Sequence, residues 1–270
     1  MGICYIDRRR IMSEVLFSAE PPLAFLTFNR PGARNALTWE MYQGLLDACE
    51  TVDQRADLRV LIVRGAGGKA FAAGTDISQF TSFRSAEDGI EYERRLDSVI
   101  DRLERVTRPT IAQVQGYATG GGCAIALTCD LIVCSPDARF GVPIAKTLGN
   151  CLSIANCARM IDLLGPARFK ELIFSARLLD VQEASGLGLV TQVAGAERID
   201  AAVRDLATTM AGHAPLTIAA TKEMVRRIQE ARRPAAETAH DLIGRVYSSA
   251  DFKEGVEAFL AKRPPRWTGA

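Results

Sequence analysis

Apolar residues in the first half of the chain follow two alternating patterns. Residues 23–29 and 58–64 are short, nearly continuous apolar runs closed by Gly or Pro turns, which predicts buried strands. After Thr38 and again after Ser85, apolar residues recur every three to four positions, which predicts helices with one buried face and a capping residue at the start. This alternation predicts an α/β fold whose strands are joined by helical crossovers.

The second half of the chain changes its pattern. Residues 109–114 and 130–134 predict two more strands, separated by a short buried helix over 123–128. After that the pattern predicts helices only, over residues 199–212, 215–231, 234–249 and 251–262. We therefore expect three parts: a loose extension over 1–13, since Met12 would also serve as a start, an α/β core over 14–198, and a helical region over 199–270.

Charge and composition narrow the function classes. With 33 Lys and Arg against 32 Asp and Glu, the net charge is +1, so no positive field would attract nucleic acid or an anionic membrane. Apolar stretches are broken by charge well short of the roughly 20 residues that span a bilayer. The first residues show no apolar segment before a small-residue cleavage site, so we expect a cytoplasmic protein.

Cysteine and histidine usage argues against two kinds of site. The seven cysteines lack metal-ligand spacing and mostly fall in apolar segments, which favours reduced, buried thiols. The only histidines in the sequence are His213 and His240, which is too few for a histidine-rich metal site and disfavours a Ser-His-Asp triad. We therefore expect no bound metal.

Two turns rich in Gly and Ala carry the most informative chemistry: GAGGKAFAAGTD over 65–76 and GYATGGGCA over 116–124. The small residues could merely permit tight turns and close packing. A nucleotide site is disfavoured, because the loose GxGxxA match opens no convincing helix and no P-loop pattern is present. The third interpretation is an oxyanion hole that takes one backbone N–H from each turn.

At this point the sequence resembles the crotonase (enoyl-CoA hydratase/isomerase) superfamily. NRPGARNALT, KAFAAGTDI, RPTIAQVQGYATGGGCAIALTCDLIV, ARFGVP, EASGLGLVTQV and EGVEAFLAKRPPRW follow one another in the family's order. The resemblance implies a spiral of repeated β-β-α units followed by a C-terminal helical region that forms a homotrimer, often paired into a dimer of trimers. It implies an acyl-CoA substrate and no cofactor beyond the CoA moiety of that substrate.

The resemblance also assigns site residues. It places the two oxyanion donors at the backbone N–H groups of Thr75 and Gly121. Contacts with CoA or the acyl group are implied for Ala33, Arg34, Ala73, Asp76, Ile77, Phe259 and Lys262.

Two positions depart from the family pattern. The hydratases of this family place one Glu two residues after the last glycine of the GGG run and another just after FGxP, where this chain has Ala124 and Ile144. General acid and base groups contribute typically about 10²- to 10⁴-fold each, so a hydratase that depends on this pair would be badly impaired. The replacement candidates are Asp76, Glu91, Glu93, Lys146, Thr147, Asn150 and Cys151. None stands out, and an orienting role for Asp76 and a buried thiol for Cys151 are favoured.

A hole without its usual carboxylates fits a reaction that forms an enolate without removing a proton. Decarboxylation of a malonyl-type thioester does this, and the C-terminal half is also similar to the methylmalonyl-CoA decarboxylase branch. The resemblance as a whole implies an acyl-CoA enzyme of the enoyl-CoA hydratase/isomerase type that stabilises a thioester enolate. The two alternatives are a malonyl-type acyl-CoA decarboxylase and a CoA-binding pseudoenzyme that serves as a subunit of a larger assembly.

Overall fold

The computed structural model describes residues 13–270, so the predicted extension lies outside the described residues except for Ser13. Nine strands form two sheets. Their bounds are β1 Val15–Glu20, β2 Leu23–Phe28, β3 Val60–Gly65, β4 Ala70–Ala73, β5 Thr110–Val114, β6 Tyr117–Thr119, β7 Leu131–Cys134, β8 Arg139–Gly141 and β9 Gln192–Val193. The α-helices are α1 Trp39–Gln54, α2 Ala86–Glu104, α3 Gly121–Thr128, α4 Ile144–Thr147, α5 Ile154–Ser175, α6 Val181–Gly186, α7 Ile199–Ala211, α8 Pro215–Glu230, α9 His240–Tyr247 and α10 Ala250–Leu260.

From β3 to β8, each pair of successive strands places one strand in each of the two sheets. The larger sheet has the order β1-β2-β3-β5-β7-β9 and is parallel except for the antiparallel β1–β2 pair, while the smaller sheet has the parallel order β4-β6-β8. Thus β3 and β4 precede α2, β5 and β6 precede α3, and β7 and β8 precede α4, with one strand of each pair in each sheet. This is the predicted spiral of β-β-α units.

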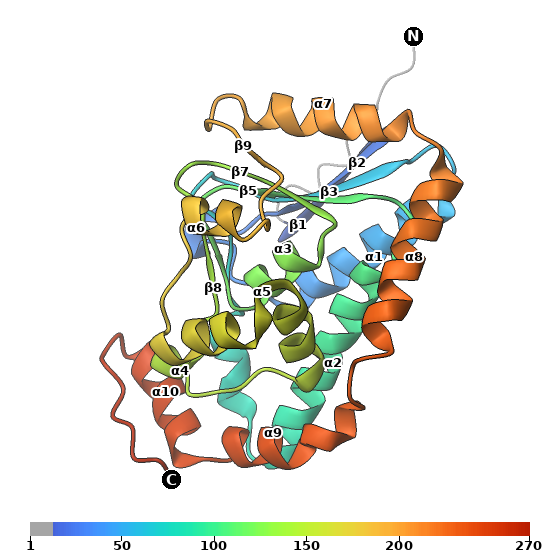
Figure 1. The fold of residues 1–270 in the computed structure, drawn as a ribbon. Coiled ribbons are helices and arrows are strands. Elements are labelled where there is room, and N and C mark those ends of the chain that lie inside the picture. The colour runs from blue at the N-terminus through green and yellow to red at the C-terminus, as the bar shows by residue number, and fades with distance from the viewer. Residues whose placement is uncertain (1–12) are drawn as a thin grey trace.

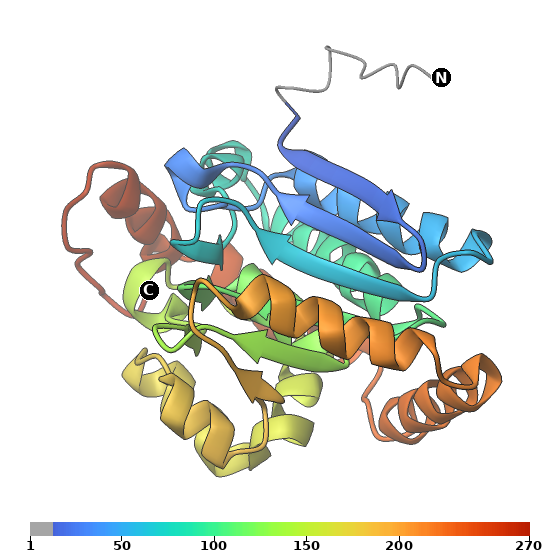
Figure 2. The same ribbon diagram turned by 90° about the horizontal axis from the view of Figure 1, so that it is seen from above.

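The larger sheet is covered on both faces, which explains its continuously apolar strands. On one face, Phe25 and Ile62 pack with Val203 of α7, and Figures 1 and 2 show α7 lying across the strands. The opposite face faces the main core, to which α1, α2 and α3 contribute. The predicted caps of the first two helices are present: Thr38 accepts from the N–H of Met41, and Ser85 forms a capping box with Asp88.

The C-terminal helices return to the core at the site end of the molecule. Helix α9 packs against α2, and α10 packs against the 3-10 helix η3 (Ile77–Ser82), as the lower part of Figure 1 shows. The prediction of a single helix over 234–249 was wrong: the segment holds a short 3-10 helix, η4 (Ala236–Ala239), followed by α9. Pro234 and the Ala-rich start lack a capping side chain, and neither Ala235 nor Ala239 offers one.

Strand β1 was not predicted. Its residues alternate between partly buried and exposed, and Leu16 on the exposed side is 41% accessible, so the apolar pattern is not clean. Among the described residues, six cysteines are free thiols, and no helix is long and apolar enough to cross a membrane.

Candidate active site

The Gly- and Ala-rich segments 65–76 and 116–124 are not turns throughout, because each contains a short strand, β4 and β6, and these strands are neighbours in the smaller sheet. Ala73 at the end of β4 is in register with Thr119 at the end of β6. Since the carboxyl ends of parallel strands lie at one edge of a sheet, the turns that follow emerge side by side. A Cβ placed on Gly120 would lie 3.3 Å from the Cα of Gly74, which measures how closely the two backbones approach.

Each turn offers one unpaired N–H at this point. Thr75 forms an isolated parallel bridge with Leu37, in which Leu37 donates to the carbonyl of Gly74 and Asp76 donates to the carbonyl of Leu37, both at 2.8 Å. The N–H of Thr75 therefore points away from Leu37, and it has no acceptor among residues 13–270. Gly121 is the first residue of α3, so its N–H has no acceptor within the helix.

Glycine is required here for two different reasons. Gly74 has a φ of +93°, a conformation that L side chains rarely adopt. Gly121 has no such strain, but a Cβ would lie 2.6 Å from the hydroxyl oxygen of Tyr42. The Tyr42 hydroxyl can therefore lie this close to the backbone of Gly121 only because Gly121 has no side chain.

A cluster of three hydroxyl groups fixes the Thr75 turn. The Oγ1 of Thr75 lies 2.9 Å from the hydroxyl oxygen of Tyr42 on α1 and 3.0 Å from that of Tyr92 on α2. Burial raises the pKa of both tyrosines well above its ordinary value, so both stay protonated. Residues from two helices thus hold Thr75 in place.

The turns open onto a cavity of about 530 Å³, a size typical of small-ligand sites. Of the residues predicted to contact CoA or substrate, Ala33, Arg34, Ala73, Asp76, Ile77 and Phe259 line it, together with Thr75, Gly121, Thr147 and Asn150. Phe259 reaches the cavity of its own chain from α10. Lys146, Lys262 and Glu91 are not among the lining residues, and Glu91 is instead paired with Arg94 on the exposed side of α2.

Ala124 and Ile144, the two positions where the resemblance leads us to expect glutamates in a hydratase, line the cavity with apolar side chains. Ala124 lies on the second turn's helix α3, and Ile144 begins α4 after the FGVP segment. Neither side chain can accept or donate a proton. The carboxyl groups that line the cavity are those of Asp76 and Glu93.

Asp76 is occupied by structural contacts. Its Oδ2 accepts from Arg30 at 2.9 Å, and its Oδ1 accepts the backbone N–H of Ser78 at the start of η3. Burial raises its pKa, but the hydrogen bonds from Ser78 and Arg30 outweigh this and leave the pKa below its ordinary value. The side chain orients the turn that carries Thr75, which is the role that the sequence favours.

Glu93 on α2 is different, because its side chain is 2% exposed and still lines the cavity. Its Oε2 accepts the N–H of Ser153 at 2.9 Å, and its Oε1 accepts the hydroxyl of Tyr247 at 2.5 Å. Burial raises its pKa to about 8, and the charge of Asp97 adds to the increase. The sequence identified Glu93 only as one of several replacement candidates and missed Tyr92 and Tyr247 altogether.

No group of three or more His, Cys, Asp or Glu side chains within residues 13–270 could hold a metal ion. The groups of the site that can act on a ligand are the unpaired N–H groups of Thr75 and Gly121 and the buried carboxyl group of Glu93.

We compared the sequence with models of known protein families. The family model for enoyl-CoA hydratase/isomerase matches residues 19–270, which include both turns and the C-terminal helices. The chain belongs to the enoyl-CoA hydratase/isomerase family. This family member is 31% identical over 253 residues to a short-chain-enoyl-CoA hydratase of Clostridium acetobutylicum, covering 93% of this chain and 96% of the relative.

Other proteins that are similar to this chain include a hydratase and a decarboxylase. A 2,3-dehydroadipyl-CoA hydratase of Escherichia coli is 32% identical, over 96% of this chain and all of that protein. Among solved structures, a methylmalonyl-CoA decarboxylase in complex with 2-nitronate-propionyl-CoA has a TM-score of 0.87 at 28% identity, covering 95% of this chain and 99% of that one. An enoyl-CoA hydratase/carnithine racemase from Magnetospirillum magneticum has a TM-score of 0.77 at 33% identity, with 96% and 97% covered.

Proposed function

We propose that this enzyme binds an acyl-CoA thioester and holds the thioester oxygen between the N–H groups of Thr75 and Gly121. Both donors are unpaired in the described chain, lie on adjoining turns and face one cavity. As negative charge builds on the thioester oxygen, these fixed dipoles stabilise it, and the loss of one such donor typically costs about 2.7 to 4 kcal/mol of barrier. The positive end of α3 adds to this stabilisation.

The reaction that we propose is decarboxylation of a malonyl-type thioester. The bond between the α-carbon and the carboxylate breaks, CO₂ leaves, and the bonding electron pair becomes the thioester enolate. No protein base is needed for this step, which agrees with Ala124 and Ile144 at the two glutamate positions. The observation that carries the proposal is that the unpaired N–H groups of Thr75 and Gly121 belong to residues lining the same cavity as the apolar side chains of Ala124 and Ile144.

Hydration is the second candidate, because curated relatives such as those of Clostridium acetobutylicum and Escherichia coli are hydratases. Adding water to an enoyl thioester requires a group that takes a proton from that water. Of the two carboxyl groups in the cavity, Asp76 is held by Arg30 and Ser78, and Glu93 is protonated at neutral pH because of its raised pKa. Asp76 is therefore not free to act as the base, and Glu93 can take a proton only in its ionised form, which becomes common only as pH rises toward about 8. At neutral pH Glu93 is better suited to giving a proton than to starting a hydration.

The test compares crotonyl-CoA with methylmalonyl-CoA in D₂O, followed by NMR and mass spectrometry. We expect CO₂ release with deuterium at the α-carbon of the product and no hydration of crotonyl-CoA. Hydration at a rate comparable to decarboxylation would refute the proposed reaction. Tight binding of CoA thioesters with no turnover across a broad panel would instead favour the pseudoenzyme.

We also propose a homotrimer, or a dimer of trimers, built through the C-terminal helices. Helix α8 supports this, because Leu216, Met224, Val225 and Ile228 on it are at least half exposed in the single chain. Sedimentation equilibrium, or light scattering after size-exclusion chromatography, measures the mass directly, and a monomer at micromolar concentration would contradict this assembly.

A further inference from the structure

We propose that Glu93 is the acid that delivers a proton to the α-carbon of the thioester enolate. The inference rests on the proposed function, since it assigns the step that follows enolate formation. Glu93 is the carboxyl group that lines the cavity without an ion-pair partner among the described residues. It supplies from α2 the acid that the chain lacks at Ala124 and Ile144.

The location of Glu93 ties it to the oxyanion hole through the backbone of one helix. The preceding residue, Tyr92, contacts the Oγ1 of Thr75 through its hydroxyl group and lines the same cavity. Adjacent residues of α2 thus hold the Thr75 turn and present a buried carboxyl group to the bound thioester. The placement of the donor and the placement of the acid are therefore fixed by one rigid element.

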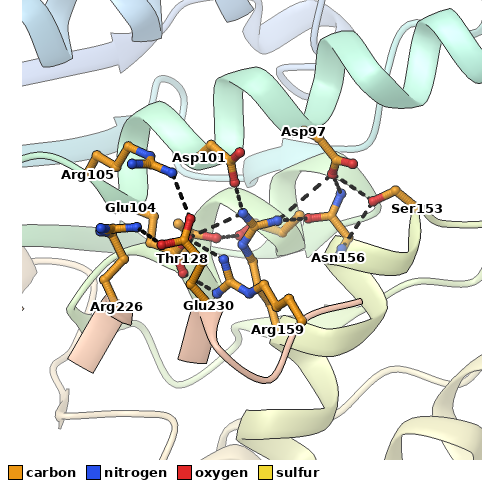
Figure 3. A network of polar contacts seen from close by, with 12 residues as sticks. Asp97, Asp101, Glu104, Arg105, Thr128, Ser153, Asn156, Arg159, Arg226 and Glu230 are labelled. Carbon is orange, nitrogen blue, oxygen red and sulfur yellow. Dashed lines mark hydrogen bonds and ion pairs between the residues drawn. The ribbon is translucent and has the colours of Figure 1, made fainter. Parts of the chain in front are cut away.

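The Ser153 side of Glu93 is anchored by a polar network. Ser153 caps α5, gives its N–H to Glu93 and donates its hydroxyl to Asp97 at 2.7 Å. Asp97 also accepts from Asn156 at 3.1 Å, and the buried Arg159 pairs with both Asp97 and Asp101, as Figure 3 shows. This network holds the Ser153 peptide in place, and among the described residues no ion pair forms with Glu93 itself.

The other side of Glu93 is supplied by the C-terminal helices. Tyr247, the last residue of α9, donates to Glu93 and accepts from the Nδ2 of Asn150 at 3.2 Å. The Oδ1 of Asn150 is buried without a hydrogen-bond partner in the described part of the chain, and Asn150 lines the cavity. Tyr247 and Asn150 act as positioning residues that fix the direction of the carboxyl group.

The charge state of Glu93 suits a proton donor. The groups that face it are Tyr92 and Asp97 on α2, Tyr247 on α9, Cys151 and Ser153 before α5, and Cys157 on α5. Burial raises the pKa of the two thiols and of both tyrosines, so all four are neutral near pH 7, and burial likewise keeps Glu93 protonated. A group with a pKa near the working pH is effective in both directions of proton transfer.

The proposed step transfers one proton from Glu93 to the α-carbon. The O–H bond of Glu93 breaks, the electron pair of the enolate forms a C–H bond at the α-carbon, and the thioester carbonyl is restored. The Glu93 carboxylate that remains takes its next proton from solvent water after the product leaves.

The experiment measures exchange of the α-protons of propionyl-CoA with D₂O, which is the reverse of this step and requires no decarboxylation. The variant is Glu93→Gln, and the matched control is Glu91→Gln, two residues earlier on the exposed side of α2. We expect exchange to fall by about 10²-fold or more in Glu93→Gln and to stay unchanged in the control. Wild-type exchange should rise with pH toward about 8, because only ionised Glu93 removes a proton.

A second readout is the stereochemistry of deuterium at the α-carbon when methylmalonyl-CoA is decarboxylated in D₂O. Wild-type protein should give one configuration, and Glu93→Gln should give a mixture, because water then supplies the proton from either face. Tyr247→Phe, which keeps the ring but not the hydroxyl, should shift the pH profile of exchange while leaving the Kd for propionyl-CoA unchanged.

The outcomes separate the two proposals. Exchange that depends on Glu93 without any decarboxylation would refute the proposed reaction and keep the acid. Decarboxylation with the same rate and stereochemistry in wild type and Glu93→Gln would refute the acid and keep the reaction. Binding of propionyl-CoA with neither exchange nor decarboxylation in wild type would overturn both.

Discussion

The buried carboxyl group of Glu93 should make the stability of the protein depend on pH in a specific window. In the folded chain the pKa of Glu93 is raised from 4.5 to about 8, mainly by burial. Because the folded state binds this proton more tightly than the unfolded state, the stabilisation is fully present below pH 4.5 and is lost as pH rises through about 8. Glu93→Gln removes the titrating group and keeps a neutral side chain of the same shape.

The size of the effect follows from linkage. Within the window one proton is released on unfolding, so the free energy of unfolding falls by about 1.36 kcal/mol per pH unit. Between pH 5.5 and 7.5 the wild type should lose at most about 2.7 kcal/mol through this group. The glutamine amide can accept from the N–H of Ser153 and donate to the hydroxyl oxygen of Tyr247, so the variant should show no such slope.

Urea unfolding, followed by circular dichroism at pH 5.5, 6.5 and 7.5, measures this difference. The pH dependence of Glu93→Gln is subtracted from that of the wild type, so groups common to both proteins cancel. The carboxylates of Asp76 and Glu104 have lowered pKa values and change charge at more acid pH, and buried thiols such as Cys123 change charge only near pH 12. Equal slopes in the two proteins would show that Glu93 is ionised in the folded state and would remove the basis for its role as an acid.

Three further perturbations test the rest of the site. Gly121→Pro removes one proposed oxyanion donor at the first position of α3, where Pro is tolerated, and a Tyr42→Phe background removes the hydroxyl that the new side chain would contact. Relative to Tyr42→Phe alone, kcat should fall about 10²- to 10³-fold, while Kd for CoA is unchanged. Asp76→Asn keeps one oxygen that can cap η3 through Ser78 but loses the oxygen that accepts from Arg30, so kcat measured over pH 6–8 should fall by less than about tenfold. A loss near that expected for a general base, about 10²-fold or more, would make Asp76 catalytic instead. Phe259 lines the cavity of its own chain, so Phe259→Ala should raise KM for acyl-CoA in that chain. When Phe259→Ala chains are mixed into oligomers with Gly121→Pro chains, the activity should not exceed that of the Phe259→Ala chains alone. Activity above that level would show that Phe259 belongs to the site of a neighbouring chain.

The resemblance assigns Thr75 and Gly121 as the oxyanion donors, and this assignment stays a prediction. The strands that bring their turns together, β4 and β6, are four and three residues long and lie inside the Gly- and Ala-rich segments, so the apolar pattern gave no signal for them. The starts of α1 and α2 agree with the prediction, because the capping residues Thr38 and Ser85 are local signals.

The environment of Glu93 could not be predicted in the same way. The pattern does carry one clue, since Glu93 lies three residues before Leu96 and seven before Ile100 and so falls on the apolar stripe of α2. Its partners come from Ser153 and Tyr247, which lie 60 and 154 residues away along the chain. Contacts at that separation depend on how α5 and α9 pack against α2, and no local pattern encodes that packing.

In the proposed function, the part of the site that stabilises the enolate is separate from the part that moves protons. The proposed donors at Thr75 and Gly121 are positioned by strand register and by glycines, so their placement depends mainly on the shape of the backbone. The side chains at Ala124 and Ile144 project into the cavity from α3 and α4 and can change without disturbing the sheet. An enzyme on this scaffold therefore keeps its ability to form an enolate when its carboxylates are lost, and its reaction is decided by where a proton donor next appears. In this chain the buried carboxyl group that meets that requirement is on α2, at Glu93.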